Sequence, residues 1–284
     1  MQMKQLTLAL LVGTMPFQIL PANCADTAAS KNAAAVYERA WTFYRQRDLN
    51  QALKCIDTAI ELSPTAPEYY LKASILQAEQ ENYFSAVLAI EKAISLVPDR
   101  AEYWHMKAQL LRSAARPQPA LECVQHAIKL QPSAPDMIMT EGLCYVDLGR
   151  WQEAETALTK SITIYEHNFN STNVDGHTFR SMAAAKLKHW PLVVEDSNVI
   201  IAEKKKTVPL AALTKAYRNK AQALVAMGKI EQARSTFNKA LATWPDDRQL
   251  LVAAKAFFES IGDKADADLQ AKHIKEFDSD MLPP

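Results

Sequence analysis

The sequence is poor in glycine, with six glycines among 284 residues. Glycine supplies the positive φ angles of many tight turns, so this scarcity argues against a protein built from many short strands. An excess of charge of one sign is also missing, because 32 basic residues balance 32 acidic ones. This balance argues against a nucleic-acid binder that depends on a positive field over a whole domain. Apolar residues make up 49% of the chain, and we expect a helical protein with a substantial core.

Motifs for catalysis, nucleotide binding and metal binding are missing as well. The sequence contains no HExxH, no CxxC, no GxGxxG and no GxxxxGK[ST], which are the usual signatures of such sites. No serine or cysteine stands in a nucleophile-elbow context. His167 and His177 flank one predicted loop, but two histidines without further ligands favour a solvated loop over a metal site. We therefore expect no enzymatic activity, no metal and no cofactor.

Long hydrophobic runs are represented by one N-terminal stretch, Leu6–Leu20, which Gly13 and Pro16 interrupt. Crossing a bilayer takes about 20 apolar residues, so the run is too short to be a membrane span. Together with the basic start it predicts a signal peptide at residues 1–25 and a linker at residues 26–32. The protein is thus expected to be exported, either to a periplasm or out of the cell. Cys24 leaves a lipid anchor open as an alternative, although Asn23 precedes it instead of Gly, Ala or Ser.

Cysteine is scarce after the predicted signal peptide, which leaves Cys55, Cys123 and Cys144. Each of them lies in an apolar helical stretch, and this favours buried thiols that pack as small hydrophobic side chains. Cys123 and Cys144 lie in adjoining segments, so a disulfide between them stays open as an alternative.

Proline, in contrast, marks an internal repeat. Pro64, Pro98 and Pro132 are 34 residues apart and close the similar stretches IELSP, ISLVP and IKLQP. When repeats are counted from residues 33, 67, 101, 135, 174, 214 and 248, position 20 is alanine in six of the seven. Positions 8 and 27 are mostly small too, which predicts two helices that cross closely. A repeat of this length predicts a solenoid, because one repeat cannot bury its own apolar face.

Local signals predict where the helices of each repeat begin and end. A bulky residue at position 17 opens the second helix, as at Tyr83, Trp151 and Trp190. Glycine at position 15 predicts a left-handed turn between the two helices, at Gly149, Gly228 and Gly262. Two capping patterns predict where the first helix of a repeat begins. They are Thr65-x-x-Glu68, which contains Pro67, and Ser133-x-x-Asp136, which contains Pro135.

These features resemble the tetratricopeptide repeat, a 34-residue helix–turn–helix unit. The resemblance is carried by Gly142, Tyr145, Gly149, Trp151, Ala154 and Leu158 in the fourth repeat, and by Ala86, Ile90, Ala93 and Pro98 in the second. It covers Ala33 to about Phe277. The resemblance implies an all-α, right-handed superhelical solenoid of about seven such repeats, of the kind that bacteria export.

The repeats divide the chain unevenly. Repeats 1–4 occupy residues 33–167, an irregular repeat 5 with insertions occupies residues 168–213, and repeats 6–7 with a C-terminal cap occupy residues 214–284. Two spacings exceed 34 residues, so extra loop or helix is expected near Asn168–Asn173 and Lys204–Val208. Lys255 at position 8 of the last repeat suits a solvated cap.

One face of the first helix in each repeat is the candidate binding site. Positions 2, 5, 9, 12 and 13 point away from the core at about 100° per residue, and the resemblance implies that they line a concave groove for a peptide or a partner helix. The candidate residues are Tyr37, Trp41, Tyr44, Leu71, Ile75, His105, Gln109, Arg112, Met139 and Leu143. The alternative is that the aromatic side chains pack inside the solenoid, and that Arg112 pairs with Glu79 or Glu102.

The sequence therefore predicts a non-catalytic scaffold or adaptor that binds a protein or peptide and no nucleic acid. Self-assembly through the same face is the alternative, and the oligomeric state stays open. Residues 26–168 hold 14 basic and 18 acidic residues, and residues 169–284 hold 17 and 14. The acidic and aromatic early repeats favour a basic or apolar segment of a partner.

Overall fold

A computed structural model describes residues 28–203 and 208–280 of the chain. Over these residues it contains fourteen α-helices and no β-strand, which confirms the predicted all-α class. The predicted signal peptide at residues 1–25, including Cys24, lies outside the described residues, as does most of the expected insertion at Lys204–Val208. No helix in the described ranges is both long and apolar enough to cross a membrane.

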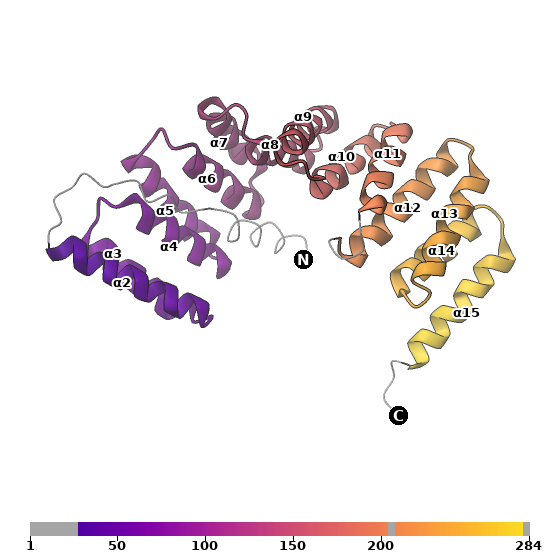
Figure 1. Ribbon diagram of the computed structural model, residues 1–284, viewed down its shortest axis with the longest axis horizontal. Helices are drawn as coiled ribbons and strands as arrows, with labels where there is room; N and C mark the ends of the chain where they lie inside the picture. The colour runs from indigo at the N-terminus through magenta and orange to yellow at the C-terminus, as the bar shows by residue number, and fades with distance from the viewer. Residues whose placement is uncertain (1–27, 204–207, 281–284) are drawn as a thin grey trace. The chain divides into compact units, whose positions relative to one another are not determined.

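The chain divides into two compact units, and the N-terminal unit ends at Ser133. Its helices form three pairs that stack in chain order, with α3 packed on α4 and α5 packed on α6 (Figure 1). These helices are α2 (Ala28–Arg45), α3 (Leu49–Leu62), α4 (Pro67–Glu79), α5 (Tyr83–Leu96), α6 (Ala101–Ser113) and α7 (Pro117–Leu130). The predicted linker at residues 26–32 overlaps the start of α2, which begins at Ala28. Its alanine-rich sequence favours helix over loop.

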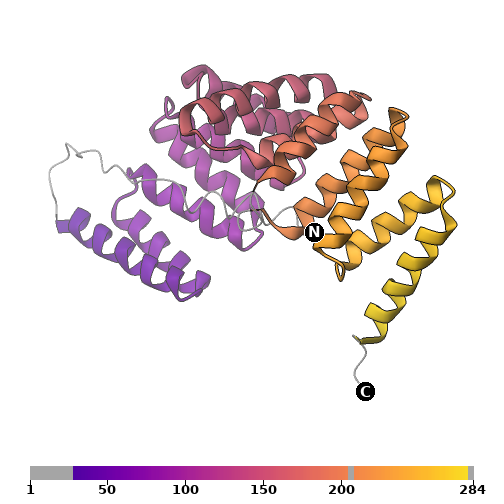
Figure 2. The same ribbon diagram turned by 45° about the vertical axis from the view of Figure 1, so that its right-hand side comes forward.

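The C-terminal unit begins at Ala134 and holds four further helix pairs (Figure 2). Its helices are α8 (Pro135–Asp147), α9 (Trp151–Phe169), α10 (Val174–Lys186), α11 (Trp190–Ala202), α12 (Leu210–Ala226), α13 (Ile230–Thr243), α14 (Arg248–Ser260) and α15 (Lys264–Asp280). Helices α5, α9 and α11 begin at the bulky residues of position 17, as predicted. Helix α9 has 19 residues whereas α7 has 14, so the insertion expected near Asn168–Asn173 is mainly extra helix.

The small residues of the repeat are buried where the paired helices cross. Ala52, Ala86 and Ala120 at position 20 are all 0% exposed. At Gly142 a Cβ atom would lie 2.7 Å from Cγ of Leu158, so α8 and α9 leave no room there for a methyl group. In the last repeat, position 8 is Lys255, which is half-buried and not fully buried like the small residues.

The predicted helix caps are wrong, although the prolines beside them are placed correctly. Pro67 and Pro135 are the first residues of α4 and α8. The N-cap residues are Ala66 and Ala134, and neither makes a side-chain cap hydrogen bond. A residue before proline is held in extended backbone, which is the N-cap conformation, so the cap falls one residue after the predicted threonine or serine.

The turn between paired helices has a left-handed residue at position 15 of every repeat. This confirms the prediction for Gly149, Gly228 and Gly262, whose φ angles lie between 72° and 78°. The other four repeats adopt the same conformation with side chains present, at Arg47, Glu81, Ala115 and Lys188. A Cβ atom in this region costs about 1 kcal/mol, so these four turns are strained.

Replacing Ala115 by glycine should therefore stabilise the protein. Ala115 has φ = 56° and an exposed side chain, and relief of the clash should raise the free energy of unfolding by about 0.5–1 kcal/mol. Urea unfolding followed by circular dichroism measures this change. The matched control is Ala114→Gly, where φ is −77°, and it should lower stability by a similar amount. A stabilising Ala114→Gly or a destabilising Ala115→Gly would contradict the assignment of strain.

Three helices of the C-terminal unit are joined by charged side chains around the buried His177, which lies on α10 and is 4% exposed. Nδ1 of His177 lies 2.7 Å from Oδ1 of Asp196 on α11, and Nε2 lies 3.0 Å from Oε1 of Glu166 on α9. Arg180 donates from Nη2 to the same Asp196 oxygen at 2.6 Å. His177 flanks the loop between α9 and α10, as predicted, but its ring is buried and not solvated.

The contacts of His177 favour the protonated form of its imidazole. Carboxylate oxygens accept hydrogen bonds, and a protonated ring can donate from both nitrogens. Burial lowers the pKa of His177, but the hydrogen bonds to Asp196 and Glu166 outweigh burial, and the pKa is raised above 6.5. Arg180 also lies 3.7 Å from a carboxylate oxygen of the exposed Glu195.

The raised pKa predicts that stability depends on pH. The His177 contribution is present in full below the unfolded-state pKa of about 6.5 and is lost as pH rises through the higher folded-state pKa. His177→Gln should abolish this pH dependence of stability. It should also lower the free energy of unfolding by about 1–3 kcal/mol at pH 6. Proton NMR of the ring gives the folded-state pKa, and urea unfolding at several pH values gives the stability. His273→Gln, at an exposed histidine, should keep the wild-type profile, and a folded-state pKa of His177 below 6.5 would refute the prediction.

Candidate functional site

Eight of the ten predicted binding residues lie in the N-terminal unit, on the first helices α2, α4 and α6 of its three pairs. Six of these eight are half-buried, namely Trp41, Tyr44, Leu71, Ile75, Gln109 and Arg112. We call these six residues the α2–α4–α6 face. The other two, Tyr37 and His105, are buried at 9% and 7% exposure.

Tyr37 belongs to the core, as the packing alternative for the aromatic side chains predicted. Its ring centroid lies 5.0 Å from that of Tyr69 and 6.4 Å from that of Trp41. Burial raises the pKa of Tyr37 to about 12, so the phenol is neutral at physiological pH. The prediction that Tyr37 faces a partner is therefore corrected: the ring fills the space where α2 meets the next repeat.

His105 is also a packing residue, so the prediction that it lines the groove is corrected. Burial lowers the pKa of its imidazole to about 4, so the ring is neutral at pH 7. Its position on α6 places it among Tyr103, Met106 and Leu110, which are buried on the same helix. A neutral, buried ring offers no charge to a partner.

Lys72 on α4 is the residue that the sequence did not single out. Its ammonium lies 3.5 Å from the ring centroid of Trp41 and 4.1 Å from that of Tyr44. The two rings stand nearly perpendicular, at 88° with centroids 5.7 Å apart, and form what we call the aromatic corner. Lys72 is 4% exposed. Glu68 precedes it by four residues, a spacing typical of a surface ion pair, which is why the pattern gives no sign of burial.

The charges around the aromatic corner follow from this burial. Loss of water lowers the pKa of Lys72 to about 8, and the negative charge of Glu79 partly opposes this, so the ammonium is still mostly protonated at pH 7. Tyr44 donates a hydrogen bond from its hydroxyl to Oε1 of Glu79 at 2.6 Å. Burial, together with this bond, raises the pKa of Tyr44 to about 12. The corner therefore holds one cation beside one fixed carboxylate.

Leu71 and Ile75 form the apolar part of the face beside the corner. Both pack partly against the core that Ala78, Tyr103 and Met106 help to build, and both keep some solvent exposure. Glu68 lies one turn before Leu71 on the same side of α4. The half-buried Glu102 at the equivalent place on α6 accepts a hydrogen bond from Nε2 of Gln131 at 3.4 Å. Carboxylates thus stand in the first turns of α4 and α6.

Met139 and Leu143, the two remaining predicted residues, lie on α8 of the C-terminal unit. Met139 is half-buried, whereas Leu143 is 4% exposed and belongs to the core. The prediction for Leu143 is corrected accordingly. It is flanked by Gly142 and Cys144, which are buried as well.

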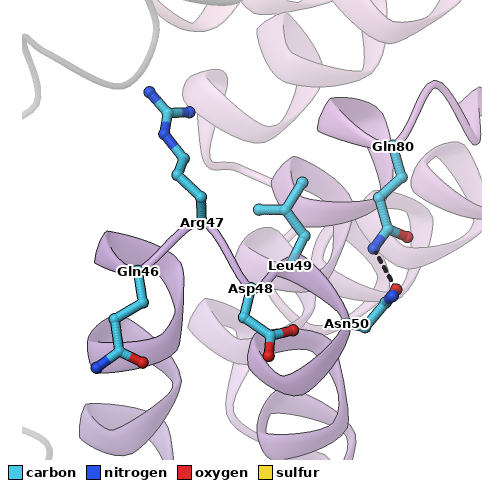
Figure 3. A pocket seen from close by; sticks show the side chains of 6 residues that line it. All are labelled: Gln46, Arg47, Asp48, Leu49, Asn50 and Gln80. Carbon is cyan, nitrogen blue, oxygen red and sulfur yellow. Dashed lines mark hydrogen bonds between the residues drawn. The ribbon is translucent and has the colours of Figure 1, made fainter.

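A shallow pocket lies elsewhere in the N-terminal unit, at the turn between α2 and α3 (Figure 3). It is lined by Gln46, Arg47, Asp48, Leu49, Asn50 and Gln80. Nε2 of Gln80 donates to Oδ1 of Asn50 at 3.0 Å, and Oδ1 of Asp48 accepts from the backbone N–H of Gln51 at 3.0 Å. The side chain of Arg47 points away from the others (Figure 3). None of the predicted binding residues lines this pocket.

Metal ligands and disulfides do not enter the site. Across residues 28–203 and 208–280, no group of three or more histidine, cysteine, aspartate or glutamate side chains could hold a metal ion. Within the same ranges no disulfide joins the cysteines, and Cys123 and Cys144 are buried, as the sequence predicted for packing thiols.

Comparison with known proteins identifies the fold. The family model of the tetratricopeptide repeat matches residues 37–101 and 218–280, and the model of anaphase-promoting complex, cyclosome, subunit 3 matches residues 79–161. No curated protein matches the chain.

Solved structures resemble it at low sequence identity. A tetratricopeptide repeat protein from Parabacteroides merdae is 18% identical with a TM-score of 0.62, covering 87% of this chain and 93% of that one. The C-terminal part of a repeat protein from Cytophaga hutchinsonii is 16% identical with a TM-score of 0.67, covering 86% and 95%. The pilF protein of Pseudomonas aeruginosa is 11% identical with a TM-score of 0.61, covering 79% and 97%.

These likenesses show a common fold and do not by themselves assign a partner. The seven helix pairs, the small residues at their crossings and the matched family model agree with one another. The chain belongs to the tetratricopeptide repeat family.

Proposed function

We propose that this protein is a non-catalytic scaffold that holds a protein or peptide partner on the α2–α4–α6 face. Tetratricopeptide repeats typically mediate protein–protein interaction, and one similar structure is described as PilW, a type IV pilus biogenesis factor. The observation that carries the proposal is the strip of Leu71 and Ile75, which follows Glu68 on α4 and stays partly exposed.

The chemistry of the strip favours a partner with apolar and basic side chains. Burial of the partner's apolar groups against Leu71 and Ile75 would supply affinity, because apolar area removed from water is the main favourable term in association. Glu68 and Glu102 would orient a basic flank and speed the encounter. A helix or an extended peptide presenting one apolar edge fits this arrangement.

Ile75 is the best residue for testing the face. Trp41 and Tyr44 support the buried Lys72 ammonium, so their loss would leave a poorly compensated charge and confuse binding with folding. Ile75 touches the core only in part. A change there alters the exposed strip with less effect on the interior.

A selection from a library of twelve-residue peptides displayed on phage should enrich sequences that combine apolar residues with lysine or arginine. Ile75→Glu should raise the dissociation constant of the enriched peptides at least tenfold, which is about 1.4 kcal/mol, because it places a charge in the apolar strip. Fluorescence anisotropy with labelled peptide measures the dissociation constant.

Leu88→Glu is the matched control, since Leu88 is 50% exposed on α5 of the same unit but lies outside the face. It should bind the peptides like the wild type. The proposal fails if Ile75→Glu binds them equally well, or if Leu88→Glu loses them. Light scattering of the same variants tests the self-assembly alternative: a wild-type oligomer that Ile75→Glu converts to a monomer would show that a second copy occupies the face.

We also propose that the protein is exported through the signal peptide at residues 1–25. The supporting observation is the basic start followed by the interrupted apolar run Leu6–Leu20. Intact-mass spectrometry of the protein from a bacterial envelope fraction should find a mature chain that begins at Ala25 or Asp26. A chain that begins at an acylated Cys24 would show the lipid anchor instead, with Cys24→Ser as the control that abolishes acylation. An uncleaved Met1 start would refute export by this route.

A further inference from the structure

Lys72 occupies the aromatic corner under unusual conditions for a lysine. Its ammonium faces the rings of Trp41 and Tyr44 at 3.5 Å and 4.1 Å, and the residue as a whole is 4% exposed. Among the residues that the structure describes, this ammonium forms no hydrogen bond and no ion pair. Two aromatic faces are therefore its main direct contacts. An ammonium normally has three donors satisfied by water or acceptors, so its loss of solvation is only partly replaced.

The corner has the features of an ammonium-binding site. The faces of tryptophan and tyrosine carry negative electrostatic potential and attract cations, and proteins use perpendicular aromatic rings to recognise ammonium groups. Tyr44 is fixed by its hydrogen bond to Glu79, so one wall of the corner is held in place. The carboxylate of Glu79 adds a negative charge next to the bound cation. Lys72 itself is carried on a flexible four-carbon stem.

We propose that the aromatic corner is a binding site for the ammonium group of a partner's lysine side chain, with Lys72 as its internal occupant that the partner displaces. The inference rests on the proposed function, because it concerns one end of the α2–α4–α6 face. Release of Lys72 would return its ammonium to water, while the incoming ammonium takes over the contacts with Trp41 and Tyr44. The exchange links partner binding to the position of one side chain.

The groups that face Lys72 allow the exchange to be followed by pH. Glu79 lies on its own helix, and Trp41, Tyr44 and the more distant Tyr37 lie on α2. The pKa values of Tyr37 and Tyr44 are raised to about 12 by burial, so both phenols stay neutral up to pH 9. The pKa of Lys72 is lowered to about 8 by burial. Among these groups Lys72 is the one that changes charge between pH 7 and pH 9.

The test uses tetramethylammonium chloride as the probe, because its charge does not change with pH. Binding is measured by the NMR shift of the Trp41 indole N–H, assigned with Trp41→Phe, at constant ionic strength. Lys72→Ala should bind the probe at least tenfold more tightly than the wild type at pH 7. The wild type itself should bind up to about tenfold more tightly at pH 9 than at pH 7, as the fraction of charged Lys72 falls. Lys72→Ala should show no such pH dependence.

Three controls separate displacement from other effects. Neopentyl alcohol has a similar shape and no charge, and its affinity for the wild type should be the same at pH 7 and at pH 9. Lys72→Met keeps an apolar stem in the corner and should bind the probe more weakly than Lys72→Ala. Lys107→Ala removes a lysine that lies 5.7 Å from a different ring, Trp104, and should leave the Trp41 signal unchanged.

Equal binding of the probe by wild type and Lys72→Ala, with helix content intact by circular dichroism, would overturn the proposal. If Lys72→Ala does not fold, the pH comparison on the wild type still decides: unchanged affinity between pH 7 and pH 9 would refute displacement. The peptide selection, tested with Ile75→Glu, does not require Lys72 to leave the aromatic corner. A failed probe experiment therefore leaves the scaffold proposal standing, and a failed selection leaves the cation site to be judged by the probe.

Discussion

The close crossing of two helices is the contact on which every repeat depends. At Gly142 the backbone of α8 comes so near Leu158 of α9 that a single added carbon would meet it at 2.7 Å. Other repeats also have a small, buried residue at the position of Gly142, such as Ala40, Ala108 and Ala221. Because the inner face of each first helix is used up by this crossing, its opposite side is left to other uses. The α2–α4–α6 face exists as a consequence of tight packing on the other side of the same helices.

The crossing also explains why strained turns are tolerated. Paired helices that approach this closely must be joined by a short connection, and the left-handed residue at position 15 provides it in all seven repeats. Arg47, Glu81, Ala115 and Lys188 accept this conformation at a cost of about 1 kcal/mol each. The apolar area buried by each pair outweighs that cost. Strain is therefore set by the packing geometry and not by any property of the turn sequence.

The periodic parts of the sequence predicted the periodic parts of the fold. The spacing of the prolines and the small residues predicted seven helix pairs, and a bulky residue at position 17 predicted where second helices begin. Contacts that occur once in the chain escaped prediction. Lys72 meets Trp41 across 31 positions, and His177 meets Asp196 across 19, so no local pattern relates them. Glu68 and Lys72 even imitate a surface ion pair, because helix spacing alone cannot tell which side of α4 a long side chain follows.

The two parts of the α2–α4–α6 face would contribute differently to binding. Leu71 and Ile75 offer area that water covers until a partner arrives, so burying them adds affinity. At the aromatic corner, a partner's ammonium would replace a contact that Lys72 already makes, so the net gain is confined to the improved solvation of Lys72. Such an exchange adds little affinity but discriminates strongly. A partner without a cation cannot replace the contacts that the two rings lose when Lys72 leaves. A partner with a carboxylate at the corner would be repelled by the carboxylate of Glu79. The apolar strip would then determine how tightly a partner is held, and the corner would determine which partner is accepted.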